Sequence, residues 1–275
     1  MTVCVGAICE NGTAAVVAAD KMVTFGPPMM LQTEPPTLKK IVKITNESVF
    51  LFSGSVPDSE EILSTVFSKL GKGQRQPVAK IAETVKVAYA DLKRKRVEET
   101  ILKPILGADF PQFQALAAQS AASQILQQVV GMIAQHNLNA EALIAGVDDS
   151  GSHLFMVGHP GLLIQVETTG YAAIGTGGLH AAVRLSLAQH TKLAPLVDTI
   201  YNVYEAKKSA DVAPGVGKLT DLAVIKAGKV MFAEQDVFKA LEKAHREKPS
   251  LTAEEQQELK KVCDELTNPK SESRP

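Results

Sequence analysis

The second residue of this 275-residue chain, Thr2, could act as the nucleophile in an acyl-transfer reaction. A small second residue normally allows an aminopeptidase to remove the initiator methionine, so we expect the mature chain to begin with Thr2. A threonine hydroxyl is a poor nucleophile by itself and needs an adjacent base. The freed α-amino group, with a pKa of about 7.7–8.0, would supply that base within the same residue.

This chemistry also needs a fixed positive charge and a donor for the oxyanion. A lysine beside the hydroxyl would favour the alkoxide and disfavour protonation of the amine, and a carboxylate would fix the lysine. A backbone N–H must point at the oxyanion of the tetrahedral intermediate. The sequence offers Lys40 and Asp20 for the first two roles, and the turn at Gly54 for the third.

Short apolar runs predict the strands that must position these residues. Residues 3–9 and 13–19 form one predicted hairpin, because the Asn-Gly pair between them tolerates positive φ. Residues 40–44 and 48–52 form a second. The proline-rich stretch 26–36 predicts a loop between the hairpins, since proline cannot donate to a sheet ladder.

Pairs of helices are predicted to alternate with these strands. Helical spacing of apolar residues after Pro57 and again after Pro77 predicts two helices, and Pro104 and Pro111 are expected to break the helical pattern. The later predicted elements are a helix at 115–135, strands at 142–147, 154–157 and 162–166, helices at 178–189 and 195–209, and a hairpin at 219–226 and 230–232.

This order predicts an α+β protein built as a four-layer αββα sandwich, in which two antiparallel sheets pack face to face between helices. The predicted domain covers residues 2–235 and includes an atypical helical stretch at about 100–138. The composition then changes, because the last 40 residues contain nine acidic and eight basic residues. Thr252 and Glu255 form a capping-box pattern, so residues 236–275 are predicted to be a charged helical extension.

Composition excludes several classes of protein. Apolar residues make up 45% of the chain and the formal charge is −1, which excludes an intrinsically disordered chain and gives no basic field for nucleic acid. No apolar run is long enough to cross a membrane, and the N-terminus lacks an export-type signal, so we expect a cytoplasmic protein. The three cysteines and six histidines show no metal-ligand spacing, and neither a metal nor another cofactor is expected.

Several segments resemble, in the same order, motifs of proteasome β-type subunits and bacterial proteasome-like peptidases, which are N-terminal-nucleophile (Ntn) hydrolases. These segments are TVCVG at 2–6, AADKMVT at 18–24, KKIVKI at 39–44, SGSVPD at 53–58, GTGG at 175–178, and AKKSAD at 206–211 ahead of DLAVI at 221–225. The resemblance implies a threonine endopeptidase on the four-layer fold.

The resemblance also implies a set of catalytic residues. These are Thr2, Asp20, Lys40, Gly54, Thr176 and Asp211. Strand alternation alone does not choose between Lys39 and Lys40, and the resemblance places the catalytic lysine at Lys40. The family usually has a serine shortly after the second acid, where this chain has Pro214, so one hydrogen bond to the amine is either missing or supplied by Thr176.

By the same resemblance, a substrate peptide adds as a strand between Thr24 and the turn at Gly54. Val23, Phe52 and Val56 would then line the pocket for the side chain on the acyl side of the scissile bond. Because all three are apolar, we expect apolar side chains to be preferred there and charged ones to be poor substrates.

The implied substrate is a peptide or unfolded protein, and the implied assembly is a homo-oligomeric ring that an ATP-dependent unfoldase could supply; no nucleic acid or membrane partner is expected. Two alternatives stay open. One is an Ntn amidase or peptide ligase on the same fold, and the other is a catalytically silent scaffold subunit. Pro214 and the long loop between Asp20 and Lys40 keep the second alternative open.

Overall fold

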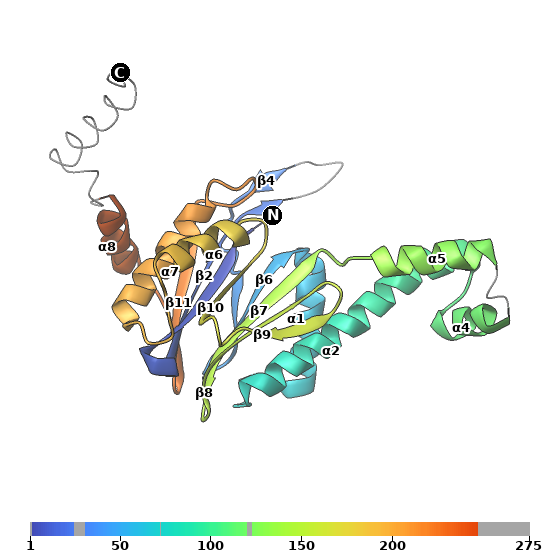
Figure 1. The fold of residues 1–275 in the computed structure, drawn as a ribbon, viewed down its shortest axis with the longest axis horizontal. Coiled ribbons are helices and arrows are strands. Elements are labelled where there is room, and N and C mark those ends of the chain that lie inside the picture. Colours follow the sequence, from blue (N-terminus) through green and yellow to red (C-terminus); the bar gives the residue numbers. More distant parts are fainter. Residues whose placement is uncertain (1, 25–30, 72, 120–122, 247–275) are drawn as a thin grey trace, which may run out of the picture. The chain divides into compact units, whose positions relative to one another are not determined.

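The computed structural model describes residues 2–24, 31–71, 73–119 and 123–246 (Figure 1). These residues form a mixed α+β structure with antiparallel sheets, which confirms the predicted α+β class. The chain divides into two compact units, Met1–Ala233 and Glu234–Pro275. The second unit is described only over helix α8, Gln235–Arg246, so the predicted capping box at Thr252 lies outside the described residues.

The first sheet has five strands in the order β10-β1-β2-β11-β12. Their bounds are β1 Cys4–Cys9, β2 Ala14–Asp20, β10 Tyr171–Ile174, β11 Thr220–Lys226 and β12 Lys229–Phe232. The predicted hairpin turn is a short 3-10 segment, Glu10–Gly12, with positive φ at all three residues. The strand β10 has only four residues, and its pattern in the sequence was too short to predict it.

The second sheet also has five strands, in the order β5-β6-β7-β8-β9. Their bounds are β5 Ile41–Thr45, β6 Ser48–Gly54, β7 Ala140–Asp148, β8 Gly151–Gly158 and β9 Leu162–Gln165. Every pairing in both sheets is antiparallel. Two short strands, β3 Val23–Thr24 and β4 Gln32–Thr33, pair with each other at the edge of the loop after β2.

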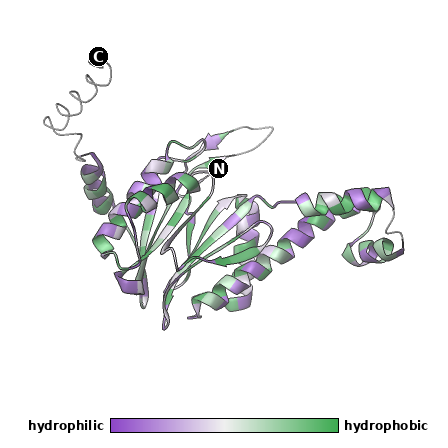
Figure 2. Ribbon diagram, in the orientation of Figure 1, coloured by the Kyte–Doolittle hydropathy of each residue, from purple (hydrophilic) through white to green (hydrophobic). Residues whose placement is uncertain are grey.

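A single apolar core lies between the two sheets. It contains Ile8 and Val17 from the first sheet and Leu51 and Leu143 from the second, all of them buried. Gly6 permits this close packing, because a Cβ added there would lie 3.0 Å from a methyl carbon of Leu154. The apolar colouring of the strands in Figure 2 follows this core.

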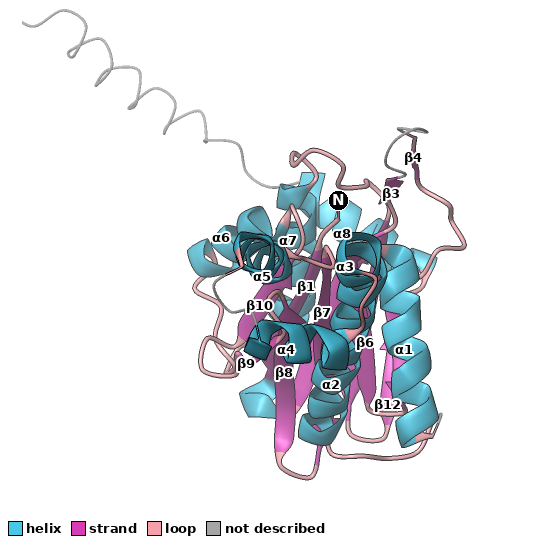
Figure 3. Cartoon of the chain, turned by 90° about the vertical axis from the view of Figure 1, so that its right-hand side faces the viewer, coloured by secondary structure: helices cyan, strands magenta, loops and turns pink. Residues whose placement is uncertain are grey.

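The strands of the second sheet are apolar on both faces. Alternate residues of β6 and β7 point away from the first sheet, and Phe50 and Ile144 pack there with Val66 and Val85 of two helices. These helices, α1 Val56–Leu70 and α2 Val78–Val97, lie in front of the strands in Figure 3. Ser55 caps α1 by accepting a hydrogen bond from the amide of Asp58.

Helices α6, Gly178–Leu187, and α7, Leu196–Ala210, pack on the first sheet against β10, β1 and β2 (Figure 1). Small and β-branched residues of α7, including Thr199, Val203 and Ala206, are buried in this contact. Both sheets therefore carry helices on the face that does not meet the other sheet. In the part of the chain that the structure describes, no helix is both long and apolar enough to cross a membrane.

The helical stretch after α2 departs from the prediction. The chain does not break at Pro104, because a π-helical turn, Glu98–Leu102, leads directly into helix α3, Lys103–Leu106. The wider π turn precedes Pro104, a residue that lacks the N–H of a regular helical bond. The predicted helix at 115–135 is described as two helices, α4 Phe110–Gln119 and α5 Gln124–Gln135, with 120–122 outside the described residues.

Candidate active site

Three segments of backbone bring Thr2, Asp20 and Lys40 together. Thr2 lies two residues before the start of β1, and Asp20 is the last residue of β2. The antiparallel register pairs Cys4 with Ala19, and the Asp20 amide donates to the Val3 carbonyl at 3.1 Å. Lys40 comes from the other sheet, immediately before β5. The site is therefore built where the ends of the two sheets meet.

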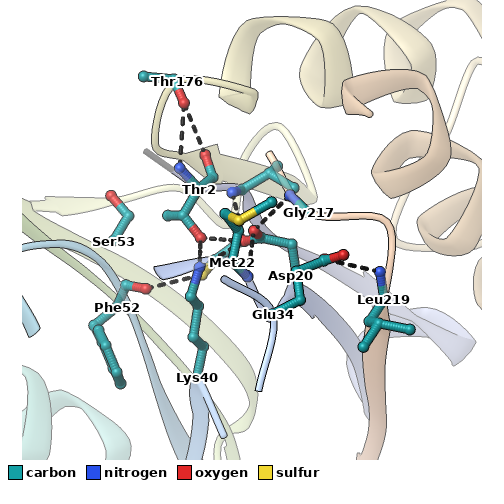
Figure 4. Close-up of polar contacts among 12 residues, drawn as sticks. Thr2, Asp20, Met22, Glu34, Lys40, Phe52, Ser53, Thr176, Gly217 and Leu219 are labelled. Atoms are coloured by element: carbon teal, nitrogen blue, oxygen red, sulfur yellow. Dashed lines mark hydrogen bonds and ion pairs between the residues drawn. The ribbon is translucent and has the colours of Figure 1, made fainter. Parts of the chain in front are cut away.

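The Thr2 hydroxyl lies between the Lys40 ammonium and the Asp20 carboxylate (Figure 4). Oγ1 donates a hydrogen bond to Asp20 Oδ1 and accepts one from Lys40 Nζ. Lys40 Nζ also forms an ion pair with Asp20 Oδ1 at 2.9 Å, and the two side chains are only 3% and 0% exposed. A buried pair of charges is tolerated when it is well hydrogen-bonded, and here the Thr2 hydroxyl bonds to both the ammonium and the carboxylate.

Backbone amides fix the Asp20 carboxylate from several directions. Oδ1 accepts from the amide of Val3 at 3.0 Å, and Oδ2 accepts from Met22 at 3.0 Å and Gly217 at 2.9 Å. The carboxylate therefore cannot rotate without breaking several bonds. Because Asp20 holds both Thr2 and Lys40, its fixed position sets the geometry of the whole group.

The turn before α6 holds the main chain of Thr2. Thr176 Oγ1 lies 3.2 Å from Thr2 N, from which it accepts, and 3.3 Å from the Thr2 carbonyl oxygen. The Gly177 amide donates to the same carbonyl at 3.1 Å. Gly175 has φ of +87°, and a Cβ there would lie 2.4 Å from the Thr2 carbonyl oxygen. Only glycine fits that position.

The turn at the end of β6 forms another wall of the site. Gly54 has φ of +90°, and a Cβ there would lie 1.7 Å from the carbonyl oxygen of Asn139. The adjacent Ser55 amide donates to that oxygen at 2.8 Å, which holds the turn against the start of β7. Gly54 lines both of the cavities that Thr2 lines, so its backbone faces the space around the hydroxyl.

A cavity of about 260 Å³ opens beside Thr2 and Lys40. All four residues expected to bind substrate line it, namely Val23, Thr24, Phe52 and Val56. A second cavity, of about 650 Å³, shares Thr2 and Gly54 with the first. The hydroxyl therefore lies at the junction of two hollows, one mainly apolar and one of mixed polarity.

Among the described residues, no hydrogen bond or ion pair joins Asp211 to Thr2. Its carboxylate pairs with Lys207 Nζ at 2.8 Å and with Lys208 Nζ at 2.9 Å. Burial lowers the pKa of Lys207, and the bond to Asp211 opposes that shift. Lys207 Nζ also donates to the Gly217 carbonyl at 2.7 Å. Asp211 therefore contacts the site only indirectly: it pairs with Lys207, Lys207 donates to the Gly217 carbonyl, and the Gly217 amide donates to Asp20.

Several contributing residues were not found from the sequence. Gly217 donates to Asp20, and a Cβ on it would lie 1.9 Å from Glu34 Oε1, which accepts from the Leu219 amide at 3.1 Å. These are backbone contacts of a loop, for which the sequence carries no signal apart from the glycine itself. Lys39 lies outside the group, with its Nζ 5.9 Å from the centre of the Phe232 ring.

The site also contains a buried thiol that does not compete with Thr2. Burial raises the pKa of the Cys4 thiol well above its usual range, although the nearby Lys40 ammonium lowers it. Its Sγ lies 3.2 Å from the Phe52 carbonyl oxygen, to which it donates. The thiolate is the reactive form of cysteine, so Cys4 is an inert core residue.

In the described ranges, no three His, Cys, Asp or Glu side chains form a group suited to a metal ion. No protein-family profile matches the chain, and no curated protein matches it. The interpretation of the site therefore rests on its geometry. A hydroxyl between an ammonium and a fixed carboxylate, beside two cavities and a glycine turn, has the parts needed for attack on a carbonyl carbon.

Proposed function

We propose that this chain is a threonine peptidase of the N-terminal-nucleophile class. The observation that carries the proposal is the buried Thr2 hydroxyl, which contacts both Lys40 Nζ and the Asp20 carboxylate. The resemblance of the sequence motifs points to the same residues. The proposal requires hydrolysis of the Met1–Thr2 bond, which frees the α-amino group of Thr2.

In this mechanism, Thr2 Oγ1 attacks the carbonyl carbon of a peptide while the α-amino group takes the hydroxyl proton. The carbonyl oxygen becomes an oxyanion, for which the backbone amide of Gly54, a residue that lines the cavity beside Thr2, is the candidate donor. The carbon–nitrogen bond then breaks, and the leaving amine takes the proton from the α-amino group. Water hydrolyses the resulting ester and restores the hydroxyl.

Lys40 and Thr176 have separate roles in this mechanism. The Lys40 ammonium favours negative charge on Thr2 Oγ1 and disfavours protonation of the α-amino group. Thr176 Oγ1 lies 3.2 Å from Thr2 N and would hold the free amine in place. The mechanism therefore tolerates Pro214 where the family usually has a serine.

The fold supports this assignment. Two antiparallel sheets share a core and carry helices on their other faces, which is the arrangement expected of a four-layer αββα sandwich of the Ntn type. The cavity lined by Val23, Phe52 and Val56 favours an apolar side chain on the acyl side. A charged side chain would be desolvated there, and Lys40, the one charged residue among the described residues that line this cavity, is already paired with Asp20.

We also propose that the peptidase self-associates, as the ring implied by the motifs requires. Helix α6 exposes Leu179, Val183 and Leu187, which are spaced by four residues and so lie on one face. A second copy of the chain would cover this stripe. Sedimentation of the wild type and of a Leu187→Glu variant would test it, since a monomeric wild type contradicts self-association.

Intact-mass spectrometry tests the central proposal. The protein is treated with a peptide that carries a hydroxyl-directed electrophile, and the Thr2→Ala variant serves as the control. We expect a mass that lacks Met1 and gains one adduct in the wild type only. Retention of Met1, or an adduct in the variant, contradicts the mechanism. Products formed with an added amine would distinguish hydrolysis from the amide-forming transfer of a ligase.

A further inference from the structure

Among the described residues that line the larger cavity beside Thr2, Glu141 on β7 is the only acidic one. The cavity has a volume of about 650 Å³. Its other polar lining includes Asn137, Asn139 and His159, and its apolar lining includes Met156, Leu162 and Ile164. No lysine or arginine is among the described residues that line it. Of the described lining residues, Glu141 is therefore the one whose side chain carries a fixed formal charge.

Glu141 is anchored through one of its two carboxylate oxygens. Oε2 accepts from Ser53 Oγ at 3.0 Å and from the Gly175 amide at 2.8 Å. Among the described residues, no hydrogen bond reaches Oε1. A carboxylate has about four acceptor sites, so this side chain is held in place and keeps capacity for a ligand. The residue is exposed and hence accessible from the cavity.

The position of this cavity relates it to the leaving side of the substrate. The attacked carbon must lie at Thr2 Oγ1, with the acyl-side chain in the smaller cavity formed by Val23 and Phe52. The peptide beyond the scissile bond then continues past Thr2 on the other side. The larger cavity begins there, since it shares only Thr2 and Gly54 with the smaller one.

We propose that Glu141 selects substrates with a lysine or arginine side chain on the leaving side of the scissile bond, an inference that rests on the proposed peptidase function. The apolar residues Leu162 and Ile164 suit the methylene stem of such a side chain, while its charged end reaches Glu141. Lys93 Nζ donates to the Pro160 carbonyl at 3.2 Å, and Lys93 is not among the described residues that line the cavity with Glu141.

Peptides that differ only at the leaving-side residue test this proposal. All carry the same apolar acyl-side residue, followed by lysine, arginine, glutamate or the uncharged lysine analogue norleucine. Because Glu141 is exposed, we expect kcat/KM to favour lysine over norleucine by about five-fold at low salt. The preference should shrink at 1 M salt, where charges are screened within about 3 Å. Equal values for lysine and norleucine at low salt overturn the proposal.

The Glu141→Gln variant separates charge from position. The glutamine carbonyl can still accept from Ser53 and Gly175, but the negative charge is gone. The ratio of the lysine to the norleucine values should fall to about one. A matched control, Glu83→Gln, removes the same charge from an exposed site on α2 and should leave the ratio unchanged. A ratio that persists in Glu141→Gln overturns the proposal.

Binding distinguishes failure of this inference from failure of the proposed function. If the wild type cleaves none of the peptides, the peptidase proposal fails, and fluorescence anisotropy with the same peptides still tests Glu141. Tighter binding of the lysine peptide than of the norleucine peptide, lost in Glu141→Gln and at high salt, supports the subsite. Equal binding of the two peptides overturns it.

Discussion

Two regions of the molecule place a hydroxyl beside a side-chain nitrogen and a carboxylate. At the first, Thr2 lies with Lys40 and Asp20 where the two sheets meet. At the second, on the hairpin between β7 and β8, Ser150 Oγ lies 2.8 Å from His153 Nε2. His153 Nδ1 in turn lies 2.6 Å from Glu167 Oε1. By residue type alone, the second group resembles the serine–histidine–carboxylate triad of many hydrolases, so Ser150 would be the expected nucleophile.

Geometry reverses that ranking. Asp148 Oδ1 lies 2.5 Å from Ser150 Oγ, which donates to it, and 3.0 Å from His153 Nε2. Each ring nitrogen of His153 therefore faces a carboxylate, and neither is free to take the serine proton. Ser150 is also exposed at a hairpin tip, where it lines a cavity of about 360 Å³, whereas Thr2 is 1% exposed and lies at the junction of two cavities. A nucleophile needs a base that can receive its proton and a walled space for the substrate, and the residue types alone supply neither.

The largest expected effect separates the two hydroxyls directly. Thr2→Ala should abolish peptidase turnover, a loss of at least about 10³-fold, because it removes the attacking atom. Ser150→Ala should leave kcat/KM within about two-fold of the wild type, because Ser150 Oγ donates to Asp148 and His153 Nε2 also faces that carboxylate. Peptide hydrolysis by the two purified variants checks this. Turnover that survives in Thr2→Ala and disappears in Ser150→Ala would mean that Ser150, and not Thr2, is the nucleophile.

The second prediction compares the two nitrogen groups. Lys40→Met removes the ammonium beside Thr2 Oγ1 and should lower kcat by about 10²–10³-fold. It also leaves the buried Asp20 carboxylate without its cation, which should destabilise the fold by about 3–5 kcal/mol.

His153→Gln is the counterpart at the exposed hairpin and should change kcat by less than about two-fold. Lys39→Met is the control for loss of a neighbouring positive charge. Circular dichroism confirms that each variant is folded before its turnover is measured. A Lys40→Met variant with wild-type kcat contradicts the assigned role of Lys40.

The third prediction concerns Lys207 and Lys208, which lie behind Asp20. Lys207→Met should lower kcat by about ten-fold, because Lys207 holds the loop whose Gly217 amide donates to Asp20. Lys208 is the more exposed of the two lysines that pair with Asp211, so Lys208→Met should lower kcat less than Lys207→Met. KM should change little in both, and a Lys207→Met variant altered only in KM contradicts the positioning role.

The central part of this site could be predicted from the sequence, and its surroundings could not. Thr2, Asp20 and Lys40 lie at strand ends, and alternating apolar runs and turns mark such ends. Thr176 was predicted by resemblance of a glycine-rich turn, and that turn does hold the Thr2 backbone. These features are local in sequence, which is why a pattern can reveal them.

The residues that were misplaced or missed depend on distant contacts. Asp211 was expected at the site, but Lys207 one helical turn earlier pairs with it. Glu141 is one acidic residue in a strand and matters only because Ser53 and Gly175 meet it from far along the chain. The helix passes Pro104 because a π turn precedes it, and no composition rule predicts that turn.

The smallest expected effect concerns the contribution of the Asp148 charge, in the hairpin group, to the stability of the fold. Burial raises the pKa of the Asp148 carboxyl, but hydrogen bonds from Ser150 and from the Val78 amide more than offset this, and the pKa is lowered to about 2. Since the unfolded value is about 3.9, the group stabilises the fold above that pH, and the contribution is lost as the pH falls toward 2.

Asp148→Asn should therefore lower the free energy of unfolding at pH 7 by on the order of 1 kcal/mol, after allowance for solvent screening. The difference from the wild type should shrink as the pH is lowered toward 3, when measured by urea denaturation. Asp149→Asn is the matched control, because its side chain is 90% exposed. A difference that stays constant with pH would mean that Asp148 acts through packing and not through charge, and the hairpin group would then have no electrostatic role to compare with that of Thr2.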